Sequence, residues 1–266
     1  MTFLGRFIRN FSWTASGSLV SNLVAFFTTF TILASLSVFD YGLLILALSV
    51  QSILSSFMGF GLEKVVSSDI AHEIGRGRKD RAKSLFLAFT KINLAMGIAI
   101  AAGLFIFAPQ ISAYLGRPEV SDLLKIVGIM VLLGGIKAIV NVLFQSAMRF
   151  KYLSIRDVSE AIARLTIILS FASLGVLDIT FAFLSYPLAI LASLAVSGVF
   201  IKRCYSIYRG VKSSKEKLFR KMVFGHGKFV IIQRPFTTIA DNSSVWIIEY
   251  AIGVQAVGLF ALARKV

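Results

Sequence analysis

The sequence predicts an all-α polytopic membrane protein. Hydrophobic residues make up 57% of the 266 residues, and the mean hydropathy is +0.82. Charged residues make up only 15%, whereas a soluble domain carries about 25%. The apolar residues are grouped in blocks of about 20, the length that an α-helix needs to cross the hydrocarbon core of a bilayer. Composition and block length together exclude an ordinary soluble domain.

Seven segments have the length and composition of membrane spans: 13–36, 41–62, 84–108, 122–146, 158–177, 179–201 and 229–250. The first is longer than the hydrophobic region of a signal peptide, and a second span follows it at once. The fifth is the least apolar, since Glu160 and Arg164 lie in its first two turns. The fifth and sixth as one helix would be about twice the hydrocarbon thickness, so a hairpin is expected near Asp178.

The positions of Lys and Arg predict the orientation of the chain. The net charge of +15 arises from 28 Lys and Arg against 13 Asp and Glu. Twenty of the 28 lie at the N-terminus and in the segments 63–83, 147–157 and 202–228, whereas the alternate loops hold only Arg117. Because cytoplasmic loops are enriched in Lys and Arg, the N-terminus and the basic linker 202–228 are expected in the cytoplasm. Topology thus explains the charge, and no nucleic-acid partner is expected.

Two stretches of the chain resemble each other at a spacing of 216 residues. The identical pairs are Ile32/Ile248, Val38/Val254, Gly42/Gly258, Leu43/Leu259, Leu46/Leu262 and Ala47/Ala263. In both copies a span follows a basic segment and leads through a short turn into the next helix. Internal repeats of this kind are typical of transporters. The repeat predicts a six-helix N-terminal lobe (1–201), a linker (202–228), and the first helix and beginning of the next helix of an incomplete C-terminal lobe (229–266).

Polar residues recur on one face of the fourth predicted span. Lys137, Asn141 and Gln145 are spaced by four residues, so that one side of a helix presents all three. Charged groups inside a membrane are costly and usually face a cavity or a partner. Lys137 lies near the middle of its span, too deep to reach the interface easily. A water-filled cavity or an ion pair is therefore expected around it.

Two other spans carry charges. In the fifth, Arg164 follows Glu160 by one helical turn, and both an ion pair with Glu160 and a position facing a cavity are open. In the seventh, Arg234 and Asp241 are seven residues apart on one face. Arg234 lies within two turns of the basic end of its span, so it can also extend to the interface.

The first two spans carry faces of small residues. They are Thr14, Ser18, Ser21, Ala25 and Thr28, flanked by Asn22, in the first, and Ser49, Ser52, Ser56 and Gly59 in the second. Such faces are typical of helix packing, and contact with a polar substrate is the alternative.

The motifs of soluble enzymes are missing from the sequence. His72-Glu73 lacks the second histidine of a zinc-binding helix. Gly75-Arg76-Gly77 is not followed by the further glycine of a dinucleotide-binding loop and follows no predicted strand. The single cysteine, Cys204, excludes an intrachain disulfide. We therefore expect neither an enzyme nor a bound metal or cofactor.

Four short segments resemble one family. They are 7–13 (FIRNFSW), 37–43 (SVFDYGL), 71–82 (AHEIGRGRKDRA) and 256–263 (AVGLFALA). They resemble polysaccharide-biosynthesis flippases of the O-antigen type, which belong to the multidrug/oligosaccharidyl-lipid/polysaccharide exporter superfamily. The resemblance implies two six-helix lobes in the cell inner membrane, around a cavity that opens alternately to each side. It implies a cargo of oligosaccharide on a polyprenyl pyrophosphate, moved from the cytoplasmic to the outer leaflet of the lipid membrane, with polysaccharide polymerases as partners.

The polar residues of the spans suit such a cargo. Cations bind pyrophosphate strongly where water is excluded, and the candidates are Lys137, Arg164 and Arg234. Hydrogen-bonding residues suit sugars, and the candidates are Asn22, Asn141 and Gln145. Asp241 is the candidate for sodium or proton coupling, because it is the only acid well inside a predicted span.

Other functions fit parts of the sequence. A cation-coupled multidrug exporter of the same superfamily needs a buried carboxylate, which Asp241 would supply. A non-transporting truncated remnant or membrane scaffold fits a chain that ends at Val266. A membrane glycosyltransferase comes third, because it needs an acidic cluster that the loops do not supply.

Overall fold

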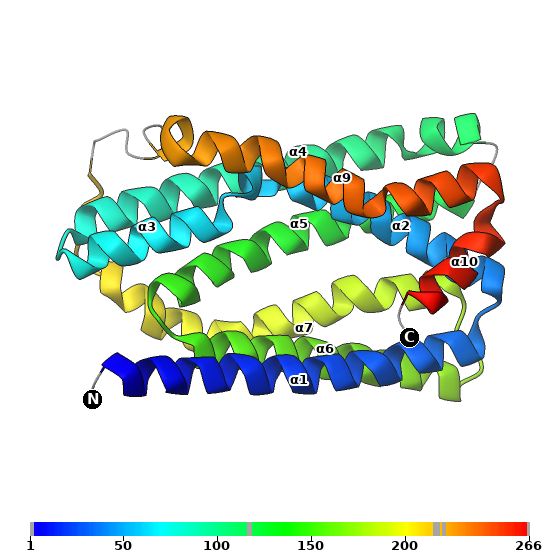
Figure 1. Ribbon diagram of the computed structural model, residues 1–266, viewed down its shortest axis with the longest axis horizontal. Coiled ribbons are helices and arrows are strands. Elements are labelled where there is room, and N and C mark those ends of the chain that lie inside the picture. Colours follow the sequence, from blue (N-terminus) through cyan, green and yellow to red (C-terminus); the bar gives the residue numbers. More distant parts are fainter. Residues whose placement is uncertain (1–2, 116–118, 215–218, 220–221, 265–266) are drawn as a thin grey trace.

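The chain folds into a bundle of long helices, in a computed structural model that describes residues 3–115, 119–214, 219 and 222–264. The α-helices are α1 (Phe3–Ser35), α2 (Val38–Phe57), α3 (Glu63–Gly75), α4 (Lys79–Leu115), α5 (Glu119–Ser146), α6 (Phe150–Ser173), α7 (Ile179–Tyr205), α9 (Lys228–Ala251) and α10 (Val254–Ala263). Shorter turns are η1 (Met58–Gly61), η2 (Ser206–Tyr208) and η3 (Val223–Gly227). Most of the helices run along the long axis of the molecule (Figure 1). Arg117 and the linker residues 215–218 and 220–221 lie outside the described residues.

Five helices in the described part of the chain are long and apolar enough to cross a membrane, namely α1, α2, α4, α5 and α7. The predicted spans 158–177 and 229–250 also form helices, α6 and α9, each of 24 residues. Charged side chains make these two less apolar than the other five. The protein is thus an all-α, multi-pass membrane protein.

The segment 63–83, which connects the second and third predicted spans, is mostly helical, with α3 at Glu63–Gly75 and the start of α4 at Lys79. The second span ends at Phe57, and η1 separates it from α3. Gly59 and Gly61 have φ angles of +52° and +65°, which interrupt the regular helix there. Beyond the break, α3 buries Val66 and Ile70 completely, one turn apart on a single face. The chain therefore continues as a broken helix along the molecule before α4 begins.

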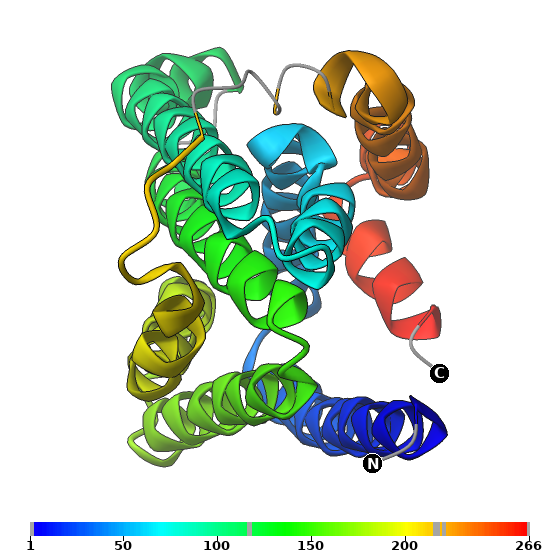
Figure 2. The same ribbon diagram turned by 90° about the vertical axis from the view of Figure 1, so that its left-hand side faces the viewer.

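The predicted reversal near Asp178 is confirmed. The helix α6 ends at Ser173 and α7 begins at Ile179. Asp178 caps α7, since its carboxylate accepts a hydrogen bond from the backbone N–H of Phe181 at 2.8 Å. Such a cap satisfies one of the free N–H groups at a helix start. The helices α6 and α7 then run back along each other, and α6 also packs along α1 (Figure 2).

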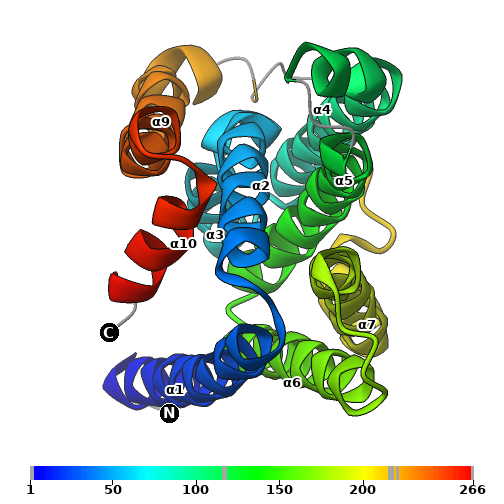
Figure 3. The same ribbon diagram turned by 90° about the vertical axis from the view of Figure 1, so that its right-hand side faces the viewer.

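The residues of the sequence repeat meet each other in space. A Cβ atom on Gly42 of α2 would collide with the carbonyl oxygen of Val254, and one on Gly258 of α10 would lie 2.5 Å from the carbonyl oxygen of Val38. Val38 and Val254 are themselves repeat equivalents, so the contact is reciprocal, as across a two-fold axis. Figure 3 shows α10 lying directly against α2. The glycines are retained at both positions because the two backbones touch there.

We expect Gly42→Ala and Gly258→Ala each to destabilise the protein by about 1–3 kcal/mol, because a methyl group has no room between the two backbones. Thermal unfolding in detergent, followed by circular dichroism, measures the effect. Gly103→Ala in α4 is the matched control, since a Cβ atom there meets nothing within 4 Å. Equal stability of all three variants would contradict the reciprocal contact.

Candidate functional site

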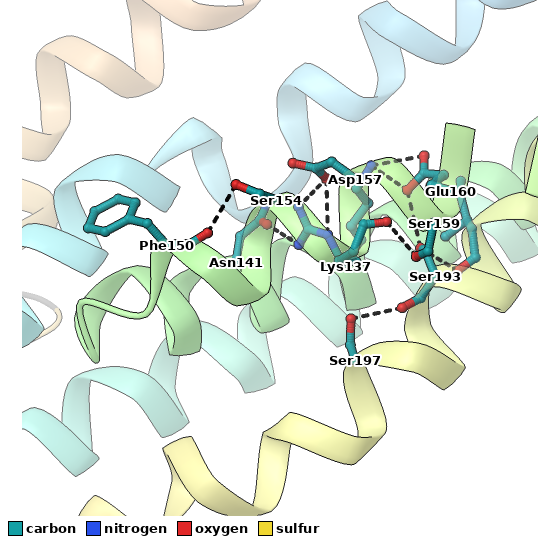
Figure 4. A network of polar contacts seen from close by, with 11 residues as sticks. Lys137, Asn141, Phe150, Ser154, Asp157, Ser159, Glu160, Ser193 and Ser197 are labelled. Atoms are coloured by element: carbon teal, nitrogen blue, oxygen red, sulfur yellow. Dashed lines mark hydrogen bonds and ion pairs between the residues drawn. The ribbon is translucent and has the colours of Figure 1, made fainter. Parts of the chain in front are cut away.

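The candidate site is a polar network between α5 and α6, with a contribution from α7 (Figure 4). On α5, Lys137 and Asn141 lie one turn apart; on α6, Arg156 and Glu160 do the same. The helix α6 packs more closely on α1 and α7 than on α5. Long side chains therefore bridge the space between α5 and α6. The network also lies between two apolar clusters of the core, since α5 contributes Met130 to one and Val140 to the other.

The expected partner of Lys137 is a carboxylate. Its Nζ atom lies 2.7 Å from Oε2 and 2.9 Å from Oε1 of Glu160. The buried hydroxyl of Ser193 on α7 donates to Oε2 of the same carboxylate at 3.2 Å. About a quarter of each charged side chain is exposed, at 26% for Lys137 and 23% for Glu160. Three helices thus meet at one ion pair.

A second set of contacts lies one turn away and is centred on Arg156. Only 3% of this residue is exposed. Its Nε and Nη2 atoms donate to Oδ1 of Asp157 at 3.1 and 2.6 Å, and its Nη1 atom donates to Oδ1 of Asn141. In the sequence, Arg156 falls in the segment 147–157, which connects the fourth and fifth predicted spans. Its spacing of four residues from Glu160 is the signal that would have placed both on one helical face.

Glu63 is an acid of this site that the sequence analysis missed. It is the first residue of α3, which is not one of the apolar spanning helices. Burial raises the pKa of its carboxyl group, while a hydrogen bond from Asn141 and the charges of Arg156, Arg234 and Lys137 oppose the rise. The sequence hides this role because Glu63 directly follows an apolar block and looks like a loop residue.

Gln145 extends the same face of α5. Its Oε1 atom accepts a hydrogen bond from the hydroxyl of Ser67 on α3 at 3.0 Å. Gln145 and Asn141 also line a cleft of about 240 Å³, together with Thr14, Ser18, Arg156 and Asp157. The structure thus brings Lys137, Asn141 and Gln145 together on one face, beside a cleft bordered by α1 and α6.

The remaining predicted residues take no part in the hydrogen bonds of this network. Arg164 does not pair with Glu160; its guanidinium carbon lies 3.5 Å from the ring centre of Tyr186 on α7, a cation–π contact. Arg234 is exposed on α9, and its aliphatic stem lies against Gly61. Asn22 is exposed on α1, one turn beyond Ser18, and is not among the residues that line the cleft.

Asp241 is also exposed, two turns beyond Arg234 on α9. The Nη1 atom of Arg264 donates to its backbone carbonyl oxygen at 3.4 Å. The structure therefore does not bring Asp241 into the polar network between α5 and α6.

The faces of small residues on α1 and α2 serve packing in part. Gly17 lies against Ser154 of α6, whose hydroxyl donates to the carbonyl oxygen of Trp13 at 2.7 Å. Ser49 and Ser56 are buried and donate to carbonyl oxygens of their own helix. Thr14 and Ser18, by contrast, line the polar cleft.

Comparison with known proteins gives one family and one fold. A family model described as "Polysaccharide biosynthesis protein" matches residues 7–266. None of the curated proteins matches the chain in sequence. Among solved structures, the chain resembles an inward-facing multidrug resistance MATE family transporter of the MOP superfamily, with a TM-score of 0.63 and 17% identity. The match covers 92% of this chain and 57% of that transporter, so the chain spans little more than half of its length.

A double-mutant cycle will measure the central ion pair. We expect Lys137→Met and Glu160→Gln to show a coupling of about 1–3 kcal/mol in unfolding free energy, because each change leaves a half-buried charge without its partner. Lys125 and Asp122 form an exposed pair at 2.8 Å on the same helix and serve as the matched control. Their coupling should stay below about 0.5 kcal/mol. Equal coupling in the two cycles would show that the central pair has no special role.

Proposed function

The chain belongs to the polysaccharide biosynthesis protein family, and from this premise we propose that it translocates a lipid-linked oligosaccharide across the membrane. The cargo would be an oligosaccharide on a polyprenyl pyrophosphate, moved from the cytoplasmic to the outer leaflet of the cell inner membrane for O-antigen or related polysaccharides. Residues 1–201 would form one lobe, 202–228 the cytoplasmic linker, and 229–266 the start of a second lobe. Alternating access would come from rocking of the two lobes against each other.

One observation carries the proposal, namely one buried and one partly buried cation between α5 and α6 beside hydrogen-bonding amides. Lys137 and Arg156 suit the pyrophosphate, while Asn141 and Gln145 suit hydroxyl groups of a sugar. Arg234 is close enough to act on the carboxyl of Glu63, so α9 adds a third cation to this region. All of these groups are compatible with a polar, anionic cargo.

Carboxylates face each of the three cations, which refines the expected mechanism. Glu160 pairs with Lys137, Asp157 pairs with Arg156, and Glu63 lies near Arg234. The phosphate groups of the cargo would exchange with the carboxylates as partners of the cations.

Arg164 offers a second binding position for the phosphate headgroup along α6. Its Nε atom is buried and has no hydrogen-bond partner among the described residues. It lies two turns from Arg156 and one turn from Glu160, about 5.4 Å per turn along α6. A headgroup leaving Lys137 would therefore meet a donor-rich guanidinium next, on the way to the end of α6 near Asp178.

Transport in proteoliposomes tests the proposal. We expect the double variant Lys137→Met/Arg156→Gln to lower the initial rate of translocation of a fluorescent polyprenyl-pyrophosphate oligosaccharide by about tenfold or more, because two charge-assisted contacts are lost. The rate is measured as the fraction of the oligosaccharide that a membrane-impermeant glycosidase can cleave over time, with the full protein that contains this sequence in the vesicles. Lys125→Met, an exposed cation on the same helix, should keep the full rate.

Loss of folding has to be separated from loss of binding. Lys137→Met/Glu160→Gln removes both charges of the pair and leaves no unpaired ion, so it should fold and still translocate slowly. A normal rate for this variant at equal protein level would refute the role of Lys137 in cargo binding.

The structural similarity to a multidrug resistance transporter favours a second candidate function, cation-coupled export of drugs. In that case Asp241 would bind sodium or a proton. Efflux of a cationic dye that depends on a sodium or proton gradient, and that Asp241→Asn abolishes, would support it. We expect no such efflux, because Asp241 is exposed on α9 and lies outside the polar network.

A further inference from the structure

A basic pocket lies at the end of the molecule where α1 and α6 begin, outside the candidate site. Its lining residues include Arg9 and Trp13 of α1 together with Arg149, Lys151 and Tyr152 around the start of α6. The pocket has a volume of about 300 Å³, and the residues that line it include three cations and no acid among those described. Its electrostatic field therefore favours an anion.

The pocket is held in shape by local contacts. The Nζ atom of Lys151 lies 4.9 Å from the centre of the Trp13 ring, a cation–π contact between α6 and α1. In the turn before α6, Met148 has a φ of +55°, and the N–H groups of Met148 and Arg149 donate to the carbonyl oxygens of Gln145 and Phe144 at 2.9 Å. The cations of the turn are thus carried on a fixed backbone.

The start of α6 adds to the positive potential. No side chain caps this helix, so its first N–H groups keep their capacity to donate. The positive end of the dipole of a 24-residue helix points into the same region. The helix start and the three cations converge on one end of the molecule.

An apolar groove continues from this pocket along the outside of α1 and α6. Trp13 lines both, and the groove then follows Val20 of α1 with Ile155, Val158 and Ile162 of α6. It has a volume of about 340 Å³ and is lined almost entirely by carbon. Thr14 and Ser18 line the polar cleft but not the groove, whereas Gly17 and Ser154 border both. The close contact between Gly17 and Ser154 therefore divides the groove from the cargo cleft.

The depth of the pocket matches a membrane surface. Trp13 lies 22 residues before the end of α1 at Ser35, which corresponds to about 33 Å of helix. The hydrocarbon core of a bilayer is about 30 Å thick. If Ser35 is at one interface, Trp13 is at the other, where tryptophan is enriched in membrane proteins. Arg9 is then one turn further out, at the level of lipid phosphates.

From these observations we propose that the pocket and groove form a binding site for one anionic phospholipid of the leaflet at the N-terminal end of α1. The phosphate binds between Arg9, Arg149 and Lys151, and one acyl chain lies in the groove between α1 and α6. A free phosphate ion would leave the adjoining apolar groove empty. The bound lipid would tie α1 to the turn between α5 and α6, next to the cleft of the proposed transport site.

Quenching of Trp13 fluorescence tests this site directly. The chain has two tryptophans, so Trp246→Phe leaves Trp13 as the only reporter. The protein is reconstituted in phosphatidylcholine with increasing fractions of brominated phosphatidylglycerol or brominated phosphatidylcholine. We expect brominated phosphatidylglycerol to reach the same quenching at a mole fraction about fivefold lower than brominated phosphatidylcholine. A preference of this size corresponds to the attraction between one basic residue and an anionic lipid.

Two charge-matched variants in this background locate the preference. The double variant Arg149→Gln/Lys151→Gln should reduce the ratio of the two mole fractions to nearly one. The double variant Lys202→Gln/Arg203→Gln, in the last turn of α7, should leave this ratio unchanged. Each variant is normalised to its own intensity in unbrominated lipid, because Lys151 contacts the Trp13 ring. If the double variant fails to fold, Arg9→Gln replaces it, with a partial loss expected.

Several outcomes would overturn the proposal. Equal quenching by the two brominated lipids would show that the site does not select anions. Equal loss of preference in both charge variants would show a diffuse surface charge instead of a pocket. Displacement of the brominated lipid by inorganic phosphate would show a free-ion site, and displacement by polyprenyl phosphate more readily than by phosphatidylglycerol would assign the pocket to the cargo.

Discussion

The ion pair between Lys137 and Glu160 is the contact on which the arrangement of the charged helices depends. A lysine inside an apolar span has to meet a carboxylate or water, since an isolated charge is costly there. The carboxylate of Glu160 is available only if the charged face of α6 turns toward α5. The other faces of α6 then pack on α1 and α7, where Gly17 and Ser193 allow close approach. This orientation of α6 thus satisfies the ion pair and both packing contacts.

The same principle explains why the site is compensated in charge. Lys137, Arg156 and Arg234 each lie near a carboxylate, because unpaired cations at this depth would destabilise the fold. A site of this kind binds an anion by exchange of partners, and acids are therefore as much a part of it as cations. Glu63 and Asp157 join Glu160 as the acids of this site.

The two copies of the repeat meet at the opposite half of the molecule from the start of α6. Gly42 and Gly258 touch the backbone of each other's helix, near the turns that precede α2 and α10. The polar cleft and the basic pocket lie toward the end where α6 begins. Clefts lie in both halves of the molecule, since a cleft of about 320 Å³ between α2, α9 and α10 is lined by residues that include Ser49, Asn242 and Arg264.

Composition and periodicity determined the helical membrane class, the hairpin near Asp178, the repeat pair Gly42 and Gly258, and the shared face of Lys137, Asn141 and Gln145, because hydropathy and helical spacing are local properties. Tertiary structure decided the partners. Whether Glu160 binds Lys137 or Arg164 depends on the rotation and depth of α5, α6 and α7, which no single helix specifies. The interruption of α2 at Gly59 and Gly61 and the burial of Glu63 likewise depend on α3 packing against α4 and α5. Local sequence predicts which residues share a helical face, and only packing decides what that face meets.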